Sequence, residues 1–331
     1  IGPAFNTGWW LKHKTKEDWI ENLNNSNFIY ISHNHPDHLH PLTLSKMNKD
    51  IPIIVPKFNE DSAGKYIEEL GFKNLIRLNF DTEYNLKNTD LIISIFKSGD
   101  FREDSGIYFS NGNFKGLLSV DSNMLNFDRY PKVDFYGASF AGGASGYPLM
   151  FDNYEKETQY KISKKEKYFL REKKFEQIKK IKPKYFLPYA GFFREKLKRD
   201  NRILKHNEKN KIKDYKNLCD KENIRLLDVE KVDNYLFSGN TLLDDSIINK
   251  KYYKDLNENK YLKYYKKEYS VVDKKFLKNY FINSDFKENL DLFISLTDDN
   301  FKALGLYYSI KFGEDDIIFN ELRSFSEKKI L

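Results

Sequence analysis

The chain has 331 residues, 16% of them aromatic, which is enough for one large domain or two ordinary domains with packed cores. Its 56 Lys and Arg against 49 Asp and Glu give a net charge of +7, but bases and acids alternate, which favours a solvated surface over a nucleic-acid partner. No apolar run is long enough to span a membrane, and the single cysteine, Cys219, excludes an intrachain disulfide. We therefore expect a cytoplasmic protein without a membrane partner.

The first half of the chain is predicted to mix short helices with many strands. Residues 16–23, 41–47 and 60–70 show helical spacing of apolar residues. Apolar runs predict strands over residues 28–32, 51–55, 75–78, 82–86, 91–96, 106–110 and 115–120. The last two strands flank Asn111-Gly112-Asn113, a hairpin signal. This succession suits an α/β fold, a four-layer αββα sandwich.

The second half continues this pattern and then changes. We expect strands over residues 133–136 and 185–187 and helices over residues 161–181 and 205–222. After about residue 252 the composition shifts to Tyr and Lys, with a helix over 273–281 and strands over 290–297 and 304–312. We interpret residues 1–240 as the main metal-binding domain and residues 241–331 as a small appended α+β unit.

One loop carries most of the recognisable chemistry. His33-Asn34-His35-Pro36-Asp37-His38 follows directly on the strand predicted at 28–32, and four of the six histidines lie between residues 33 and 40. Imidazoles at this spacing, with a carboxylate, are typical of metal ligands at the end of a buried strand. Asp121 closes a later predicted strand and can supply a further carboxylate.

The number of ligands indicates which kind of metal site is possible. The turn after residue 96 offers Asp100 or Asp104 but no imidazole, so a five-histidine dinuclear site cannot be assembled. We expect a single metal with open coordination positions, its candidate ligands being His33, His35, Asp37, His38 and Asp121. Such a set suits iron(II) and dioxygen, or alternatively one zinc with bound water. Asp37 and His38 are the candidate catalytic groups, and we expect His40 not to be a ligand.

Two glycine-containing loops are candidates for substrate binding. Residues 140–148 follow a predicted strand, and residues 188–193 place aromatic rings beside a glycine at another strand end. Small residues let backbone amides approach an anion or a sugar, and the rings could stack on a base. The candidate residues are Gly142, Gly143, Ser145, Gly146, Tyr147, Tyr189 and Gly191.

These motifs resemble those of known proteins. The histidine loop resembles the metallo-β-lactamase fold, and residues 2–10, 30–33, 140–148 and 185–193 resemble the CMP-N-acetylneuraminate monooxygenase (CMP-sialic acid hydroxylase) family, with a fainter likeness at 276–281 and 297–299. The resemblance implies a monooxygenase that hydroxylates the N-acetyl group of a CMP-linked sialic acid or a related nucleotide sugar. It also implies an electron donor, a b-type cytochrome or ferredoxin with its reductase, acting through an amino-terminal Rieske 2Fe-2S domain.

The chain departs from these patterns in two respects and leaves alternatives open. Asp100 stands in the turn where hydrolases of this fold tend to place a histidine. A Rieske cluster needs two Cys and two His, and Cys219 alone cannot supply them, so we expect that domain upstream of Ile1. The alternative enzyme is a zinc-dependent hydrolase of a phosphodiester, lactone or amide. A third reading is a binding module without turnover. The sequence leaves open the metal, its nuclearity, the nucleotide sugar and the oligomeric state.

Overall fold

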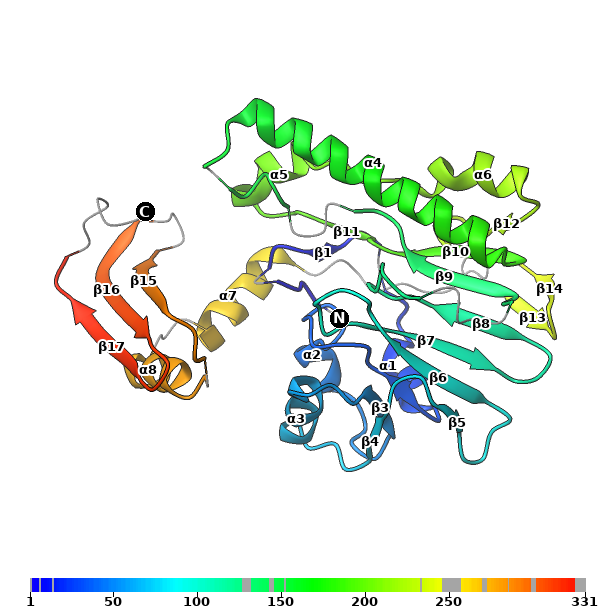
Figure 1. The fold of residues 1–331 in the computed structure, drawn as a ribbon, viewed down its shortest axis with the longest axis horizontal. Helices are drawn as coiled ribbons and strands as arrows, with labels where there is room; N and C mark the ends of the chain where they lie inside the picture. The colour runs from blue at the N-terminus through cyan, green and yellow to red at the C-terminus, as the bar shows by residue number, and fades with distance from the viewer. Residues whose placement is uncertain are drawn as a thin grey trace. The chain divides into compact units, whose positions relative to one another are not determined.

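The computed structural model (Figure 1) describes the chain apart from residues 1, 6, 14, 127–131, 143–145, 152, 233, 246–256, 270–272, 285, 299–301 and 325–331. The chain divides into two compact units, Ile1–Asp255 and Leu256–Leu331, and each is described by itself. Among the helices of the described ranges, none has the length and apolar character of a membrane span.

The larger unit is built on a seven-stranded sheet in the order β12-β10-β9-β8-β7-β6-β5. Its strands are β5 (Glu83–Asn85), β6 (Ile92–Lys97), β7 (Ser105–Ser110), β8 (Lys115–Leu118), β9 (Phe135–Ser139), β10 (Tyr185–Ala190) and β12 (Arg225–Leu226). Pairing is antiparallel from β5 to β8 and parallel from β8 to β12. The hairpin predicted around Gly112 is confirmed, with Ser110 paired to Lys115.

A second, parallel sheet of three strands carries the start of the histidine loop. It consists of β2 (Ile29–Tyr30), β3 (Ile53–Pro56) and β4 (Leu75–Leu78), connected through α1 (Trp19–Asn24), α2 (Pro41–Leu44) and α3 (Ser62–Glu69). All four residues of β3 are buried, as expected for a strand covered on both faces. Gly71 follows α3 with a φ of 85°, the left-handed conformation that ends a helix.

Alternation along β3 shows what covers each face of this small sheet. Ile53 and Val55 pack with Ile67 of α3, whereas Ile54 packs with Ile93 and Ile95 of β6 in the large sheet. Successive side chains of a strand point to opposite faces, so one face of the small sheet meets helices and the other meets the large sheet.

The opposite face of the large sheet is covered by helices. Ile178 of α4 (Lys156–Ile181) and Leu218 of α6 (Lys216–Lys221) belong to a buried cluster with Leu117, Tyr136 and Phe186 of the sheet. Figure 1 shows α4 along this face, on the side away from α1, α2 and α3. The unit is therefore a mixed α/β structure whose helices flank its sheets.

The helix predicted over residues 205–222 is wrong. After η2 (Lys198–Asp200), the structure has separate short pieces over this range: the end of α5 (Asn201–His206), then η3 (Ile212–Tyr215) and α6. Asn210 lies between them, and its backbone N–H donates to the Ala141 carbonyl at 2.7 Å while its side chain donates to Phe140 O and Lys167 O. These long-range bonds stabilise an extended segment where helical spacing alone would continue the helix.

Two further strand pairs complete the larger unit. β1 (Trp10–Leu11) pairs antiparallel with β11 (Phe193–Arg194), and β13 (Leu236–Ser238) forms a hairpin with β14 (Thr241–Asp244). The first pair joins positions almost two hundred residues apart, because Trp10 is the partner of Arg194. It therefore fixes the amino-terminal segment beside the loop that follows β10.

The smaller unit combines two helices with a three-stranded antiparallel sheet. It contains α7 (Glu258–Tyr269), α8 (Lys274–Ile282), β15 (Leu290–Thr297), β16 (Ala303–Phe312) and β17 (Ile317–Leu322). Among its described residues Tyr308, Ile310 and Phe312 of β16 form the buried core, and Leu277 and Phe281 of α8 pack on them. The predicted helix and the two predicted strands are confirmed, whereas β17 was not predicted.

Candidate metal centre

The histidine loop begins where β2 ends and is fixed by the start of β7. The Ile31 N–H donates to Ile54 O at 3.0 Å, which extends the parallel pairing by one residue. Ser105 Oγ donates to Ser32 O at 2.7 Å and lies 2.6 Å from the Tyr30 hydroxyl. Because Ser32, His33 and Ser105 are buried, these bonds set the position at which the chain leaves the small sheet.

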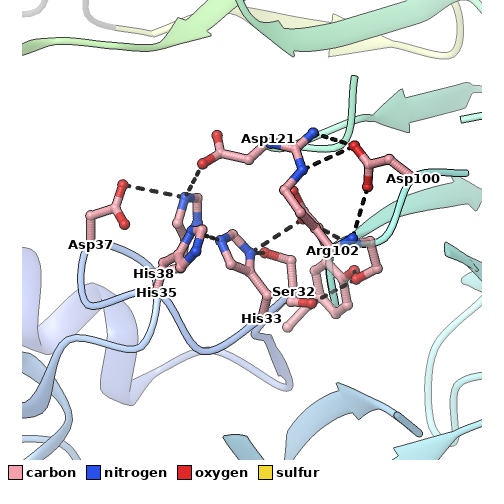
Figure 2. Close-up of polar contacts among 11 residues, drawn as sticks. Ser32, His33, His35, Asp37, His38, Asp100, Arg102 and Asp121 are labelled. Carbon is pink, nitrogen blue, oxygen red and sulfur yellow. Dashed lines mark hydrogen bonds and ion pairs between the residues drawn. The ribbon is translucent and has the colours of Figure 1, made fainter. Parts of the chain in front are cut away.

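Three side chains of the predicted set converge on one point. His33, His38 and Asp121 each offer one ligand atom, and these atoms all lie within 4.8 Å of one another. His38 Nε2 lies 3.4 Å from Asp121 Oδ2 and 3.5 Å from Asp37 Oδ2, so its ring stands between the two carboxylates (Figure 2). A cation of ordinary size could be held at this point by imidazole nitrogen and carboxylate oxygen.

Asp121 reaches this point through a strained turn. β8 ends at Leu118, and Val120 has a φ of 52°, a left-handed conformation that is costly for a β-branched residue. Backbone bonds to the neighbouring strand fix the turn on both sides: Ser119 N donates to Gly137 O, and Ser139 N donates to Val120 O. The strain directs Asp121 away from the sheet and toward the histidine loop.

The buried ring of His33 has partners for both nitrogens. Its Nδ1 lies 2.8 Å from Ser32 Oγ and 3.3 Å from Asp104 Oδ1. Ligating histidines usually donate their second N–H to a carboxylate, which fixes the tautomer and the orientation of the ring. With the proton on Nδ1, Nε2 of His33 is the nitrogen that faces the other candidate ligands.

His35 and Asp37 lie at the edge of the cluster. His35 Nδ1 lies 2.8 Å from His33 Nε2, and its ring meets Phe5 edge-on with centroids 6.0 Å apart. Asp37 contacts one member of the cluster, His38. Both residues therefore lie beside the cluster, each in contact with one of its histidines, while the three converging atoms come from His33, His38 and Asp121.

The surroundings set the protonation states of the group. Burial, followed by the charges of His38 and His35, lowers the pKa of His33 to about 3. Burial opposes protonation of His38, but its hydrogen bond to Asp121 and the charges of Asp121 and Asp37 outweigh this and raise its pKa. Burial opposes ionisation of Asp121, but the hydrogen bond from His38 together with the charges of His38, His33 and His35 outweighs it and lowers the pKa. A neutral His33 and an ionised Asp121 are the forms that a metal binds.

Burial also changes the two carboxylates beside these rings. The pKa of Asp37 is raised by burial and by the charge of Asp121. The pKa of Asp104 rises to about 7 for the same two reasons. Groups shifted this far are enriched at functional sites.

The turn between β6 and β7 does not add a ligand. Asp100 Oδ2 accepts from Arg102 Nε at 2.9 Å and from Nη2 at 2.5 Å, so this carboxylate is paired with a base. Asp104, the other carboxylate that this turn offers, contacts His33 Nδ1 instead. The turn thus contributes a partner for a ligand and a fixed positive charge, neither of which the sequence pattern indicated.

Two cavities adjoin the cluster. The first, about 150 Å³, is lined by Asp37, Asp121 and Arg102 and by residues of both glycine-containing loops, among them Gly142 and Gly191. The second, about 380 Å³, has mainly apolar walls, to which the aromatic rings of Trp10, Tyr189 and Phe192 contribute. Trp9 and Phe193 line both, and their rings stack with centroids 3.9 Å apart.

The glycine-containing loops meet at the first cavity. Gly191 has a φ of 108°, and a Cβ there would lie 2.3 Å from the Ala141 Cβ, so only glycine allows the close approach of the two loops. Gly142 has a φ of 72°. Tyr147 packs edge-on against Phe151 and Tyr154, and Gly146 lies against Met150. Gly143 and Ser145 lie outside the described residues.

The remaining histidines have other surroundings. Nδ1 of His40 accepts from the Thr43 N–H and so caps α2. His13 lies at the surface 3.4 Å from Glu230 Oε1, and His206 packs on Tyr160. None of the three belongs to the cluster of ligand atoms found in the described part of the chain.

The fold and the cluster together define a mixed α/β protein with a candidate metal centre of imidazole and carboxylate ligands. No family model matches the chain. It is 35% identical to the cytidine monophosphate-N-acetylneuraminic acid hydroxylase of Mus musculus over 234 residues, 67% of this chain and 40% of that protein. The hydroxylases of Asterias rubens and Xenopus laevis are also 35% identical, over 222 and 221 residues.

The chain spans only 33–40% of the length of these relatives. Over the matched stretch it is related to the CMP-N-acetylneuraminate hydroxylase family, and the resemblance predicted from the sequence is confirmed.

Solved structures resemble the chain more distantly. A mutant of the CmlA beta-hydroxylase matches with a TM-score of 0.39 and 16% identity, over 61% of this chain and 43% of that one. A possible metal-dependent hydrolase from Veillonella parvula matches with a TM-score of 0.40 and 11% identity, over 73% of this chain and 87% of that one.

Proposed function

We propose that this chain is the metal-binding part of a monooxygenase that hydroxylates the N-acetyl group of a CMP-linked sialic acid or a related nucleotide sugar. The observation that carries the proposal is the convergence of His33, His38 and Asp121 in a chain 35% identical to hydroxylases of that substrate. We further infer that the two sheets and their flanking helices form an αββα sandwich of the metallo-β-lactamase type.

The residues present fit a single metal ion. Two imidazoles from one loop and a carboxylate from another meet within 4.8 Å, and the second nitrogen of His33 is already held by Ser32 and Asp104. A set of two histidines and one carboxylate is typical of mononuclear iron(II) oxygenases. We assign His33, His38 and Asp121 as ligands, with His35 and Asp37 completing the set.

The chain's own groups would position the substrate and handle protons. Bound iron would supply the activation of dioxygen. Asp37, whose pKa is raised by burial and by Asp121, lies at the cavity wall beside His38 and is placed to accept or return a proton. The stacked rings of Trp9 and Phe193 line both cavities and would help to exclude bulk water from them.

We assign substrate and electron partners from the same reasoning. The loops with Gly142, Gly143, Ser145, Gly146 and Tyr147, and with Tyr189 and Gly191, would hold the nucleotide sugar through backbone amides and aromatic faces. Electrons would come from a b-type cytochrome or ferredoxin with its reductase, through a Rieske cluster carried outside this chain.

The test is metal analysis followed by turnover. The chain is purified without oxygen, its metal is measured by mass spectrometry, and CMP-N-acetylneuraminic acid binding is measured by titration calorimetry. Oxygen and a chemical reductant are then added, and the molecular mass of the product is measured by mass spectrometry. We expect one iron per chain, substrate binding and a mass gain of one oxygen atom. One zinc per chain with cleavage of an ester or phosphodiester and no hydroxylation would contradict the proposal.

A further inference from the structure

A fixed positive charge lines the same cavity as the candidate metal ligands. Arg102 is the only base among the described residues that line this cavity, and it shares the wall with Asp37 and Asp121. Its side chain is 37% exposed, so the guanidinium is accessible while part of its stem is covered. Figure 2 shows it on the far side of Asp121 from His38.

Asp100 holds this guanidinium in one orientation. Nε and Nη2 of Arg102 both donate to Asp100 Oδ2, and the Arg102 backbone N–H donates to Asp100 Oδ1 at 3.2 Å. Within the described residues these bonds leave Nη1 of Arg102 without a partner. A planar guanidinium fixed along one edge presents its other donors in a set direction, which is the geometry that recognises carboxylate and phosphate groups.

The charge balance of the cavity changes when the cluster is filled. Without a cation, Asp37 and Asp121 offset Arg102 and would repel an anion. A divalent cation bound to Asp121 offsets the charges of Asp37 and Asp121 and so removes that repulsion, which leaves the Arg102 guanidinium able to receive an anion. Binding of the cation before the substrate would therefore favour a substrate that carries a negative charge.

We propose that Arg102 is the anion-binding residue of the substrate cavity, receiving a carboxylate or phosphate oxygen of the nucleotide sugar, and that Asp100 is the positioning residue for its guanidinium. The proposal rests on the proposed function. It also gives a role to the turn between β6 and β7, which carries Asp100 and Arg102 where a dinuclear site would need another imidazole. The cavity of about 150 Å³ suits one acidic group with part of a sugar ring, not a whole nucleotide.

The test compares three probes on the iron-loaded chain without oxygen. Titration calorimetry measures the binding of CMP-N-acetylneuraminic acid, of its carboxylate methyl ester and of CMP to the wild type, Arg102→Gln and Arg102→Lys. We expect Arg102→Gln to lose about 10- to 100-fold in affinity for the parent compound, as loss of a charge-assisted pair does. Arg102→Lys keeps the charge without the fork and should lose less.

The methyl ester and CMP identify the acidic group. If the carboxylate is bound, the wild type and Arg102→Gln bind the ester equally and bind CMP equally. If the phosphate is bound, the loss persists with all three probes. Either outcome supports the assignment, because in both the loss depends on one acidic group of the substrate.

A matched arginine controls for general effects. Arg77 is ion-paired with Asp61 and Glu68 and does not line the cavity, so Arg77→Gln removes the same charge elsewhere. Equal binding of all probes by Arg102→Gln and wild type, or an equal loss in Arg77→Gln, overturns the assignment of Arg102. A wild type that binds none of the probes overturns the proposed function itself.

Asp100 is tested by rescue. Asp100→Asn should bind CMP-N-acetylneuraminic acid more weakly than the wild type, with a smaller loss than Arg102→Gln, and should keep its iron. Asp100→Glu should recover most of that loss. An unchanged affinity in Asp100→Asn contradicts the positioning role. So does a loss that Asp100→Glu does not recover.

Discussion

Two of the loops that meet at the candidate metal centre, besides the turn after β8 that carries Asp121, differ in what they contribute. The loop after β2 supplies His33, His35 and His38, whereas the loop between β6 and β7 supplies Asp104 against His33 and the paired Asp100 and Arg102. The first loop carries ligand atoms, and the second carries the groups that orient and charge them. A metal centre is thus divided between a segment that a motif identifies and a segment that only the fold brings to it.

The largest expected effect comes from breaking the ligand loop. His38→Ala removes one of the three converging nitrogen and oxygen atoms, and we expect the affinity for iron(II) to fall by more than about 100-fold, beyond what loss of an outer partner costs. Competition with a chromogenic chelator measures it. His13→Ala, which removes a surface histidine paired with Glu230, is the control and should bind metal as the wild type does.

In the loop between β6 and β7, we expect a substitution at Asp104 to lower metal affinity almost as much, and a substitution at Asp100 to leave it unchanged. Asp104→Asn puts an amide beside His33 Nδ1, which can move the ring proton to Nε2, the nitrogen facing the other ligands. We expect a loss of about 10- to 100-fold in metal affinity. Asp100→Asn should leave metal affinity unchanged, because Asp100 bonds to Arg102. Equal losses in both variants would contradict the division of roles within this loop.

The bond that joins the two loops is expected to act on stability. Ser105 Oγ bridges the Tyr30 hydroxyl and the Ser32 carbonyl, and Ser105→Ala leaves both groups buried and unsatisfied. We expect a loss of about 1–3 kcal/mol in the free energy of unfolding, measured by urea denaturation. Ser45→Ala removes an exposed hydroxyl bonded to Leu42 O and should change little. A Ser105→Ala chain as stable as the wild type would show that the loops are held elsewhere.

A further effect, which depends on pH, is expected on the face of the large sheet that α4 covers, where a buried amine lacks the partners that the loop residues have. Lys174 of α4 is fully buried over the Tyr136 ring, its Nζ has no hydrogen-bond partner among described residues, and burial lowers its pKa to about 7. The unfolded chain keeps this proton up to pH 10.4, so it binds more protons than the folded chain above pH 7, and stability should rise with pH there.

Lys174→Met removes that dependence. Between pH 7 and pH 9 we expect the wild type to gain about 1–3 kcal/mol that the variant does not gain, and the variant to be the more stable at pH 7. Lys179→Met, an exposed neighbour on the same helix, is the control. Parallel pH profiles for the wild type and Lys174→Met would show that the amine finds a partner in solution.

The sequence predicted the parts of this molecule that local patterns determine. Strand periodicity, the hairpin at Gly112 and the helix stop at Gly71 reflect neighbouring residues, and the structure confirms them. The meeting of Asp121 with His33 and His38 was expected from two strand ends, and the structure brings these three together.

Other features depend on contacts that no local pattern contains. The break after α5 requires Asn210 to reach Ala141 and Phe140, and the role of Asp104 requires β7 to lie beside the end of β2. A lone aspartate in a polar turn gives no sign of either. Arg102 was missed for the same reason, because its importance comes from the cavity that it lines.

Because β1 pairs with β11, a deletion at the start of this sequence would change the wall of a cavity beside the candidate metal centre. Trp9 and Trp10 stand a few residues from the first residue of the sequence, yet they form cavity wall with Phe193. A deletion of the residues up to and including Leu11 would remove the strand pair of β1 and β11 and would expose the second cavity to solvent on that side.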